Sequence, residues 1–227
     1  MISRVRASHA VAIIFSLAAC APSARVLRGT PTPGALPPTR LSAKPTLIKF
    51  AWTYKDETFE ANGDGAVRVG PPDRARLDFF LKNGMTGGYA ILVRDSLEVP
   101  GIDLVRRFLP PVPLLWAALG RLALQSTKDT VVRVDGDTLR ADLGDLRGRD
   151  ASVADGRAWR LAYVGTTLAR VERIEGGRII ESVTRRRNSV GQWDLQYVHE
   201  GARRRLGIIV TDTTIVEGFD DAIWRKP

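Results

Sequence analysis

Large apolar residues alternate with polar ones along most of this chain, and that alternation limits it to a sheet-rich fold. In the run 48–54, Phe50, Trp52 and Tyr54 occupy every second position. Successive side chains of a strand point to opposite faces, so this pattern predicts a strand with one buried face. Similar runs follow, separated by Gly, Asn, Asp and Pro, which favour turns. The predicted strands are 48–54, 66–69, 74–81, 89–93, 131–134, 138–141, 157–163, 168–174, 179–186, 193–199, 206–211 and 214–219.

Near-consecutive antiparallel strands of this kind form a meander that curves into a large sheet or a barrel. The segment 62–65 (NGDG) predicts a turn before the second strand. Two apolar segments, 104–109 and 114–119, instead read as short helices, and Pro113 suits the first turn of the second one. This helical pair has two open interpretations: a cover over the core, or a movable lid over an apolar cavity.

The N-terminus has the order of a secretory signal peptide. Arg4 and Arg6 precede the apolar run 10–15, and small residues lead into Cys20, the single cysteine. The run is shorter than the roughly 20 apolar residues that span a bilayer. The ending LAAC at 17–20 resembles the lipobox of bacterial lipoproteins, in which cleavage falls before an acylated cysteine. The resemblance predicts a signal peptide at 1–19 and lipidation of Cys20; the alternative is an ordinary signal peptide with a chance cysteine.

A proline-rich stretch follows the cysteine. Residues 21–45 hold six prolines and show no apolar periodicity. This composition predicts a semi-extended tether, with packed structure beginning near Leu47. The expected organisation is therefore a signal peptide at 1–19, a lipidated cysteine and tether at 20–45, and a β domain at 46–227. Two or three acyl chains on Cys20 would give effectively permanent attachment to a membrane.

The chain is basic, with a formal net charge of +9 and arginine triplets at 185–187 and 203–205. Because neighbouring strand residues face opposite sides, each triplet places at least one arginine toward solvent. Two interpretations stay open: a solvated sheet face, or a surface that meets acidic head groups. Export argues against nucleic acid as the partner.

The residue types of nucleophilic and metal chemistry are sparse. Beyond the signal peptide the chain holds one histidine, His199, and no serine lies in a GxSxG motif. Zinc sites need several His or Cys ligands, and no phosphate-binding glycine loop joins a strand to a helix. We therefore expect no catalytic residue, no metal and no cofactor.

Two segments are similar to parts of the LolA/LolB superfamily of bacterial lipoprotein carriers and receptors. The segment 76–80 (RLDFF), with the loop at Met85, is similar to a strand and protruding loop of LolB-type receptors. The segment 111–116 (PVPLLW), closed by Leu119 and Gly120, is similar to their proline-led segment. The resemblance implies an unclosed antiparallel β-barrel of about 11 strands, in which a short helical insertion acts as lid or plug over a cavity that accepts acyl chains. It also implies that Met85 is the apolar residue of a membrane-contact loop.

We therefore expect a lipoprotein on the periplasmic face of the outer membrane that binds acyl chains of a lipid or lipoprotein. Ala21 and Pro22 stand where enterobacterial sorting places an inner-membrane retention aspartate, and by that resemblance they favour the outer membrane. The alternative is a structural lipoprotein that docks an envelope protein partner without a ligand. The candidates for cavity or lid, each of which could equally be plain core, are Phe50, Trp52, Phe79, Leu92, Trp116 and Leu119.

Overall fold

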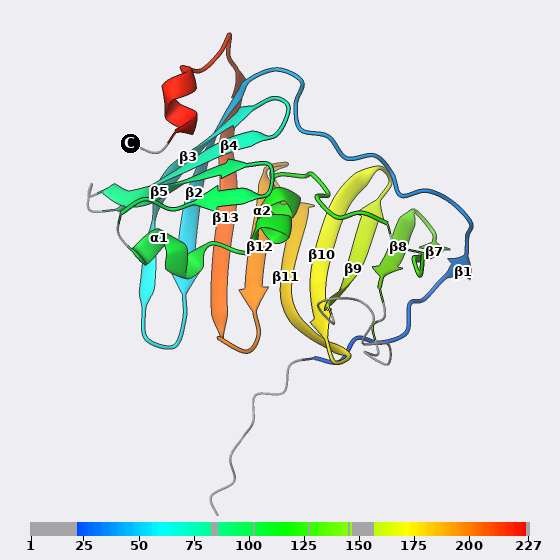
Figure 1. The fold of residues 1–227 in the computed structure, drawn as a ribbon. Coiled ribbons are helices and arrows are strands. Elements are labelled where there is room, and N and C mark those ends of the chain that lie inside the picture. The colour runs from blue at the N-terminus through cyan, green and yellow to red at the C-terminus, as the bar shows by residue number, and fades with distance from the viewer. Residues whose placement is uncertain are drawn as a thin grey trace, which may run out of the picture.

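The computed structural model describes residues 22–82, 86–101, 103–126, 128–144, 146 and 157–225. Within these residues, thirteen strands form a single antiparallel sheet, and two short helices pack on one of its faces (Figure 1). The elements are β1 Thr30–Pro31, β2 Thr46–Lys55, β3 Glu60–Gly70, β4 Arg74–Leu81, β5 Thr86–Val93, β6 Ser96–Glu98, α1 Asp103–Phe108, α2 Val112–Ala118, β7 Val131–Asp135, β8 Thr138–Leu143, β9 Arg157–Val164, β10 Thr167–Glu175, β11 Arg178–Arg187, β12 Trp193–His199, β13 Arg204–Ile215 and the 3-10 helix Asp221–Trp224.

The sheet curls without closing. The strand order is β1-β7-β8-β9-β10-β11-β12-β13-β2-β3-β4-β5-β6, so β1 and β6 are its two edges and do not pair with each other in the described part of the chain. The last long strand, β13, returns to β2 and pairs with it from Arg205↔Lys55 to Ile215↔Thr46. The predicted unclosed antiparallel barrel with a helical insertion is confirmed.

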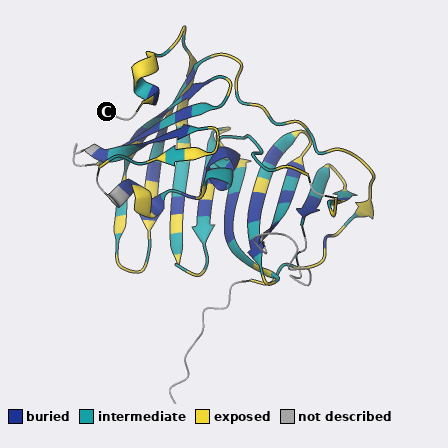
Figure 2. Ribbon diagram, viewed as in Figure 1, coloured by how far each residue is buried: buried dark blue, intermediate teal, exposed yellow. Residues whose placement is uncertain are grey.

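Strand β2 shows why the alternation produces a core. Phe50, Trp52 and Tyr54 are at most 2% exposed, whereas Lys49 before them, Thr53 between them and Lys55 after them face solvent. Buried and exposed positions alternate in the same way along other strands (Figure 2). The inward residues of both halves of the sheet meet beneath the helices in one hydrophobic core.

The turn expected at 62–65 is wrong, because these residues lie inside β3. The chain turns earlier, where Asp56 Oδ1 accepts hydrogen bonds from the backbone N–H groups of Thr58 and Phe59, both at 2.9 Å. Gly65 serves close packing instead: a Cβ there would lie 2.2 Å from the ring of Phe50. A glycine in a strand often marks such a close approach.

The two strands expected at 206–211 and 214–219 are also wrong, because β13 continues to Ile215. The pairing with β2 shifts between Val210 and Asp212, so one extra residue interrupts the alternation there. That interruption resembled a strand end in the sequence. Beyond Ile215 the chain leaves the sheet, and Phe219 packs edge-on against Trp224 with ring centroids 5.9 Å apart.

The expectation that packed structure begins near Leu47 is wrong as well. Leu27 is 7% exposed, β1 pairs with β7, and Leu36 and Leu41 pack against the core. The segment follows the sheet from its β7 edge across to β2 (Figure 1). By pairing with β7 it covers an edge that would otherwise offer unpaired backbone groups. The predicted signal peptide at 1–19, Cys20 and Met85 lie outside the described residues.

No helix in the described part of the chain has both the length and the apolar character needed to span a membrane.

Candidate functional site

Helix α2 is set over the sheet by its own apolar residues. It starts after Pro111, carries a proline in its first turn as the sequence predicted, and buries four consecutive residues, 114–117. The indole Nε1 of Trp116 donates to the carbonyl oxygen of Arg94 at 2.7 Å, which fixes the helix to the end of β5. The helix lies against β10 and β11. The helix ends at Ala118, and two residues later Gly120 has a φ of +91°, a left-handed conformation that favours glycine.

Beneath α2 lies a cavity of about 160 Å³. The helix contributes its roof, strands β2 to β4 contribute one wall, and β11 to β13 contribute the other. The lining is mainly apolar and includes Ile48, Phe50, Leu77, Leu115, Leu119 and Ile208.

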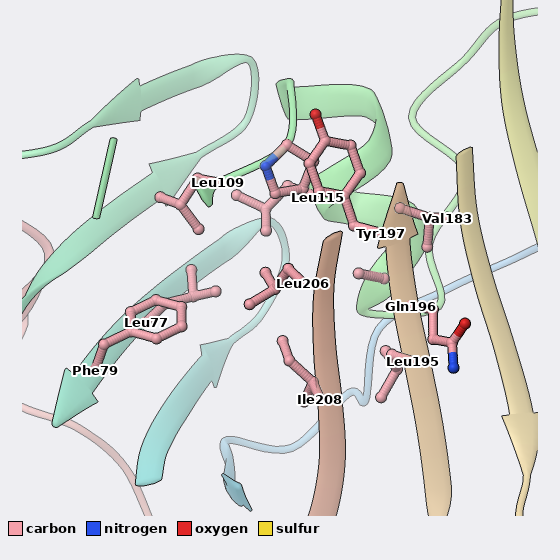
Figure 3. A pocket seen from close by; sticks show the side chains of 12 residues that line it. Leu77, Phe79, Leu109, Leu115, Val183, Leu195, Gln196, Tyr197, Leu206 and Ile208 are labelled. Carbon is pink, nitrogen blue, oxygen red and sulfur yellow. The ribbon is translucent and has the colours of Figure 1, made fainter. Parts of the chain in front are cut away.

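Figure 3 shows the side chains that line a second, smaller cavity of about 20 Å³, which shares part of its lining with the first. Leu77, Leu115 and Ile208 belong to the lining of both, so the same side chains separate the two spaces. An apolar cavity of about 150 Å³ holds a molecule of the size of benzene. The larger cavity therefore has room for a short hydrocarbon segment, and a long acyl chain requires α2 to move outward.

Arg185 is the charged residue in the lining of the larger cavity. Its guanidinium stacks on Trp193 with 4.4 Å between Cζ and the ring centroid, and its Nη1 donates to the carbonyl oxygen of Leu168 at 3.3 Å. Burial, together with the nearby charge of Arg187, lowers the pKa of the Arg185 guanidinium to about 10. It stays protonated at neutral pH, so the cavity carries a positive charge.

Helix α1 closes a tightly packed part of the core. Phe108 is fully buried and packs against Trp52, Tyr54 and Phe79, with ring centroids 5.1–5.3 Å apart. Each aromatic ring of this cluster fills the space between α1 and the sheet. The cluster is a packed core and not a ligand site.

The structure divides the six residues predicted for cavity or lid. Phe50 and Leu119 line the larger cavity, and Phe79 lines the smaller one. Trp52, Leu92 and Trp116 are buried in the core and line neither space. The indole N–H of Trp52 donates a hydrogen bond to the carbonyl oxygen of Asp64 at 3.0 Å.

Sequence reasoning missed Arg185 and Trp193 because the triplet 185–187 was considered as a surface feature. The alternation already contained the signal: Val183 faces the core, and Arg185 follows two places later on the same face. Arg186, on the opposite face, pairs with Asp194 at 2.8 Å and is exposed as expected.

The described residues contain no cluster of three or more acidic, His or Cys side chains that could hold a metal ion. His199 lies away from both cavities, and its Nδ1 accepts from the backbone N–H of Ala202 at 3.1 Å. His199 is the last residue of β12, and this contact links it to the turn that follows.

No family model and no curated protein matches the chain. Among solved structures, it is similar to a LolA superfamily protein from Nitrosomonas europaea, with a TM-score of 0.50 and 12% identity over 82% of this chain and 92% of that one. It is also similar to a putative outer membrane lipoprotein-sorting protein domain from Vibrio parahaemolyticus, with a TM-score of 0.48 and 9% identity over 81% and 90% of the two chains. The chain therefore has a LolA-like fold, in agreement with the resemblance in its sequence.

Proposed function

We propose that the chain is a lipid-anchored envelope protein that binds an acyl chain of a lipid or lipoprotein in the cavity beneath α2. The observation that carries this proposal is an unfilled, mainly apolar space of about 160 Å³ roofed by one short helix. The fold shared with a LolA superfamily protein supports it. The lipobox-like sequence ending at Cys20 supports a lipid anchor, and Ala21 and Pro22 after it favour the periplasmic face of the outer membrane. Binding and release need no covalent chemistry.

The driving force is burial of the acyl chain. Each methylene removed from water contributes about 0.8 kcal/mol, so six methylenes contribute about 5 kcal/mol before the cost of ordering the chain. Additional methylenes must displace α2, which rests on apolar contacts with β10 and β11. The length of chain that enters is therefore set by how far the helix moves.

Ala118 offers a graded test because it lines both cavities. The variants Ala118→Val and Ala118→Phe fill progressively more of the space. Binding is measured with the neutral fluorescent probe N-phenyl-1-naphthylamine, which brightens in apolar sites. We expect the affinity to fall slightly for valine and at least about tenfold for phenylalanine, a loss that corresponds to burying two or so fewer methylenes.

Stability is the internal control for this series. Overpacking a filled core destabilises a protein by about 1–3 kcal/mol, whereas a phenyl group that enters an empty space leaves the melting temperature unchanged or higher. Leu119→Ala, which enlarges the cavity, should keep or strengthen probe binding. If the parent chain binds neither the probe nor any fatty acid, the proposal fails and a structural lipoprotein that docks a protein partner becomes the better interpretation.

A further inference from the structure

Arg185 places a positive charge in the mainly apolar lining of the larger cavity. Other largely buried arginines of the sheet form ion pairs with buried acids: Arg160 with Asp142 at 2.7 Å, and Arg173 with Glu181 at 2.6 Å. Arg185 forms no ion pair with any described residue. Arg185 therefore differs from Arg160 and Arg173, whose charges are paired with acids.

The contacts of the Arg185 side chain leave several of its N–H donors available to a ligand. A guanidinium has five N–H donors. One contact reaches the carbonyl oxygen of Leu168, the ring of Trp193 covers one face, and the buried Nε has no partner. The head group lies against the end of α2, since a Cβ added at Gly120 would be 2.7 Å from Nη1.

An unpaired cation in such a place is costly, because burial removes the water that would otherwise solvate it. The lowered pKa of Arg185 expresses that cost. The cavity lining supplies no carboxylate, and its other polar side chain is Thr213. The charge is therefore complementary to an anion that arrives with the ligand.

We propose that Arg185 binds the anionic head, carboxylate or phosphate, of a single-chain lipid whose hydrocarbon chain lies in the cavity against Phe50, Leu119 and Ile208. The inference rests on the proposed function and narrows its ligand to acyl chains that carry an anionic head. Thr213, on β13, supplies a hydroxyl on the same lining. Stacking on Trp193 keeps the guanidinium plane in place, so that its donors are oriented before the ligand enters.

The test compares three ligands of equal chain length: decanoate, decyl phosphate and the neutral 1-decanol. Each displaces N-phenyl-1-naphthylamine from the full chain carrying Cys20→Ala, so that no lipid attached to the chain itself competes. We expect the anions to bind at least about tenfold more tightly than decanol, the usual range for a hydrogen bond to a charged group. A preference for decanoate over decyl phosphate identifies a fatty acid as the source of the head, and the reverse preference identifies a single-chain phosphate lipid such as a lysophospholipid.

The matched variants are Arg185→Gln and Arg187→Gln. Arg187 stacks on the same Trp193 ring at 4.1 Å, but its Nη1 donates to the carbonyl oxygen of Gly191 outside the cavity. Arg185→Gln should abolish the preference for anions while decanol binding stays within about twofold, a difference below 0.5 kcal/mol. Arg187→Gln should preserve the preference.

A measurement without any variant guards against misfolding of Arg185→Gln. The ¹³C shift of bound [1-¹³C]decanoate, followed against pH, should show a carboxyl pKa below that of free decanoate, because a nearby cation favours the ionised form. A raised carboxyl pKa, or equal affinity for decanoate and decanol, overturns the role of Arg185 and leaves the proposed function intact. Failure of all three ligands to displace the probe overturns the proposed function itself.

Discussion

The two helices of the insertion lie a few residues apart in sequence and are held in opposite ways. Two contacts hold helix α1 in place. Phe108 packs in an aromatic cluster, and Arg107 donates hydrogen bonds from Nε and Nη2 to the Asp56 carboxylate at 2.7 and 2.9 Å. Helix α2 lies partly over unfilled space. It is held by its buried residues 114–117, by the hydrogen bond of the Trp116 indole and, beyond its C-terminal end, by Arg121, which meets Asp73 at 3.1 Å.

The difference shows that the two helices of one short insertion can have separate roles, α1 in stability and α2 in binding. A helix that closes a packed core contributes stability, because its removal exposes fully buried rings. A helix over a cavity loses fewer contacts when it moves, since the groups facing the void have no partners there. We therefore expect α1 to act as the fixed hinge side of the insertion and α2 to be the part that responds to a ligand.

The strongest test of this comparison is truncation of one residue on each helix. Phe108→Ala should cost about 3–5 kcal/mol of unfolding free energy, as for other fully buried aromatic residues. Leu119→Ala should cost clearly less, because part of that side chain already faces empty space. Urea unfolding of both variants measures the difference, and equal losses would show that α2 is as tightly packed as α1.

An intermediate effect is expected at the end of α2. Gly120→Ala places a side chain in a left-handed conformation, at a cost of about 1–2 kcal/mol, and pushes its Cβ against the Arg185 guanidinium. Gly136→Ala is the matched control, because φ is +61° there and no atom lies within 4 Å of the added Cβ. Thermal unfolding should show a larger loss at Gly120, and a similar loss at both positions would mean that Arg185 moves aside freely.

A smaller global effect, and one with a characteristic pH dependence, is expected for Asp56→Asn. The Arg107 guanidinium and the Tyr54 hydroxyl hold the pKa of the Asp56 carboxyl well below its usual range. A carboxyl with a lowered pKa in the folded state stabilises that state above its unfolded pKa of about 3.9, and the contribution disappears as the pH falls further. The melting temperature of Asp56→Asn should therefore lie below that of the parent chain at pH 5–8 and approach it under more acidic conditions.

Asp73→Asn is the control for the ion pair near α2. It removes a single 3.1 Å contact with Arg121 instead of a two-pronged one, so its effect at neutral pH should be smaller. A larger effect than that of Asp56→Asn would reverse the assignment of α1 as the fixed side.

The sequence predicted those features that depend on local alternation. Strands such as β2, with Phe50, Trp52 and Tyr54 on one face, follow directly from the period of two. The sequence failed where a distant neighbour decides the outcome: Gly65 belongs to a strand because the Phe50 ring crosses it, and Leu27 is buried because the edge of β7 accepts a partner. Composition at these positions matched a turn and a tether equally well.

The candidate site was only partly predictable for a different reason. A cavity is the space left between side chains that come from six strands and one helix, and no local pattern specifies such a space. Phe50, Phe79 and Leu119 were identified as apolar candidates, but apolar residues of the core have the same pattern. Arg185 was identifiable only as an inward-facing position of β11, and the meaning of its charge depends on the acids that are absent from the lining.

The N-terminal segment determines how far an anchored domain could swing. Pro22 accepts from the backbone N–H of Ile179, and Ser23 bridges to Arg178 at the β10–β11 turn. Only two residues lie between Cys20 and Ser23, so their Cα atoms are at most about 11 Å apart, whereas a free coil of residues 22–45 would allow roughly 25–30 Å. A lipid on Cys20 would therefore hold the β10–β11 turn of the barrel close to the membrane. The barrel could tilt about this turn, but the cavity would stay at a nearly constant distance from the membrane.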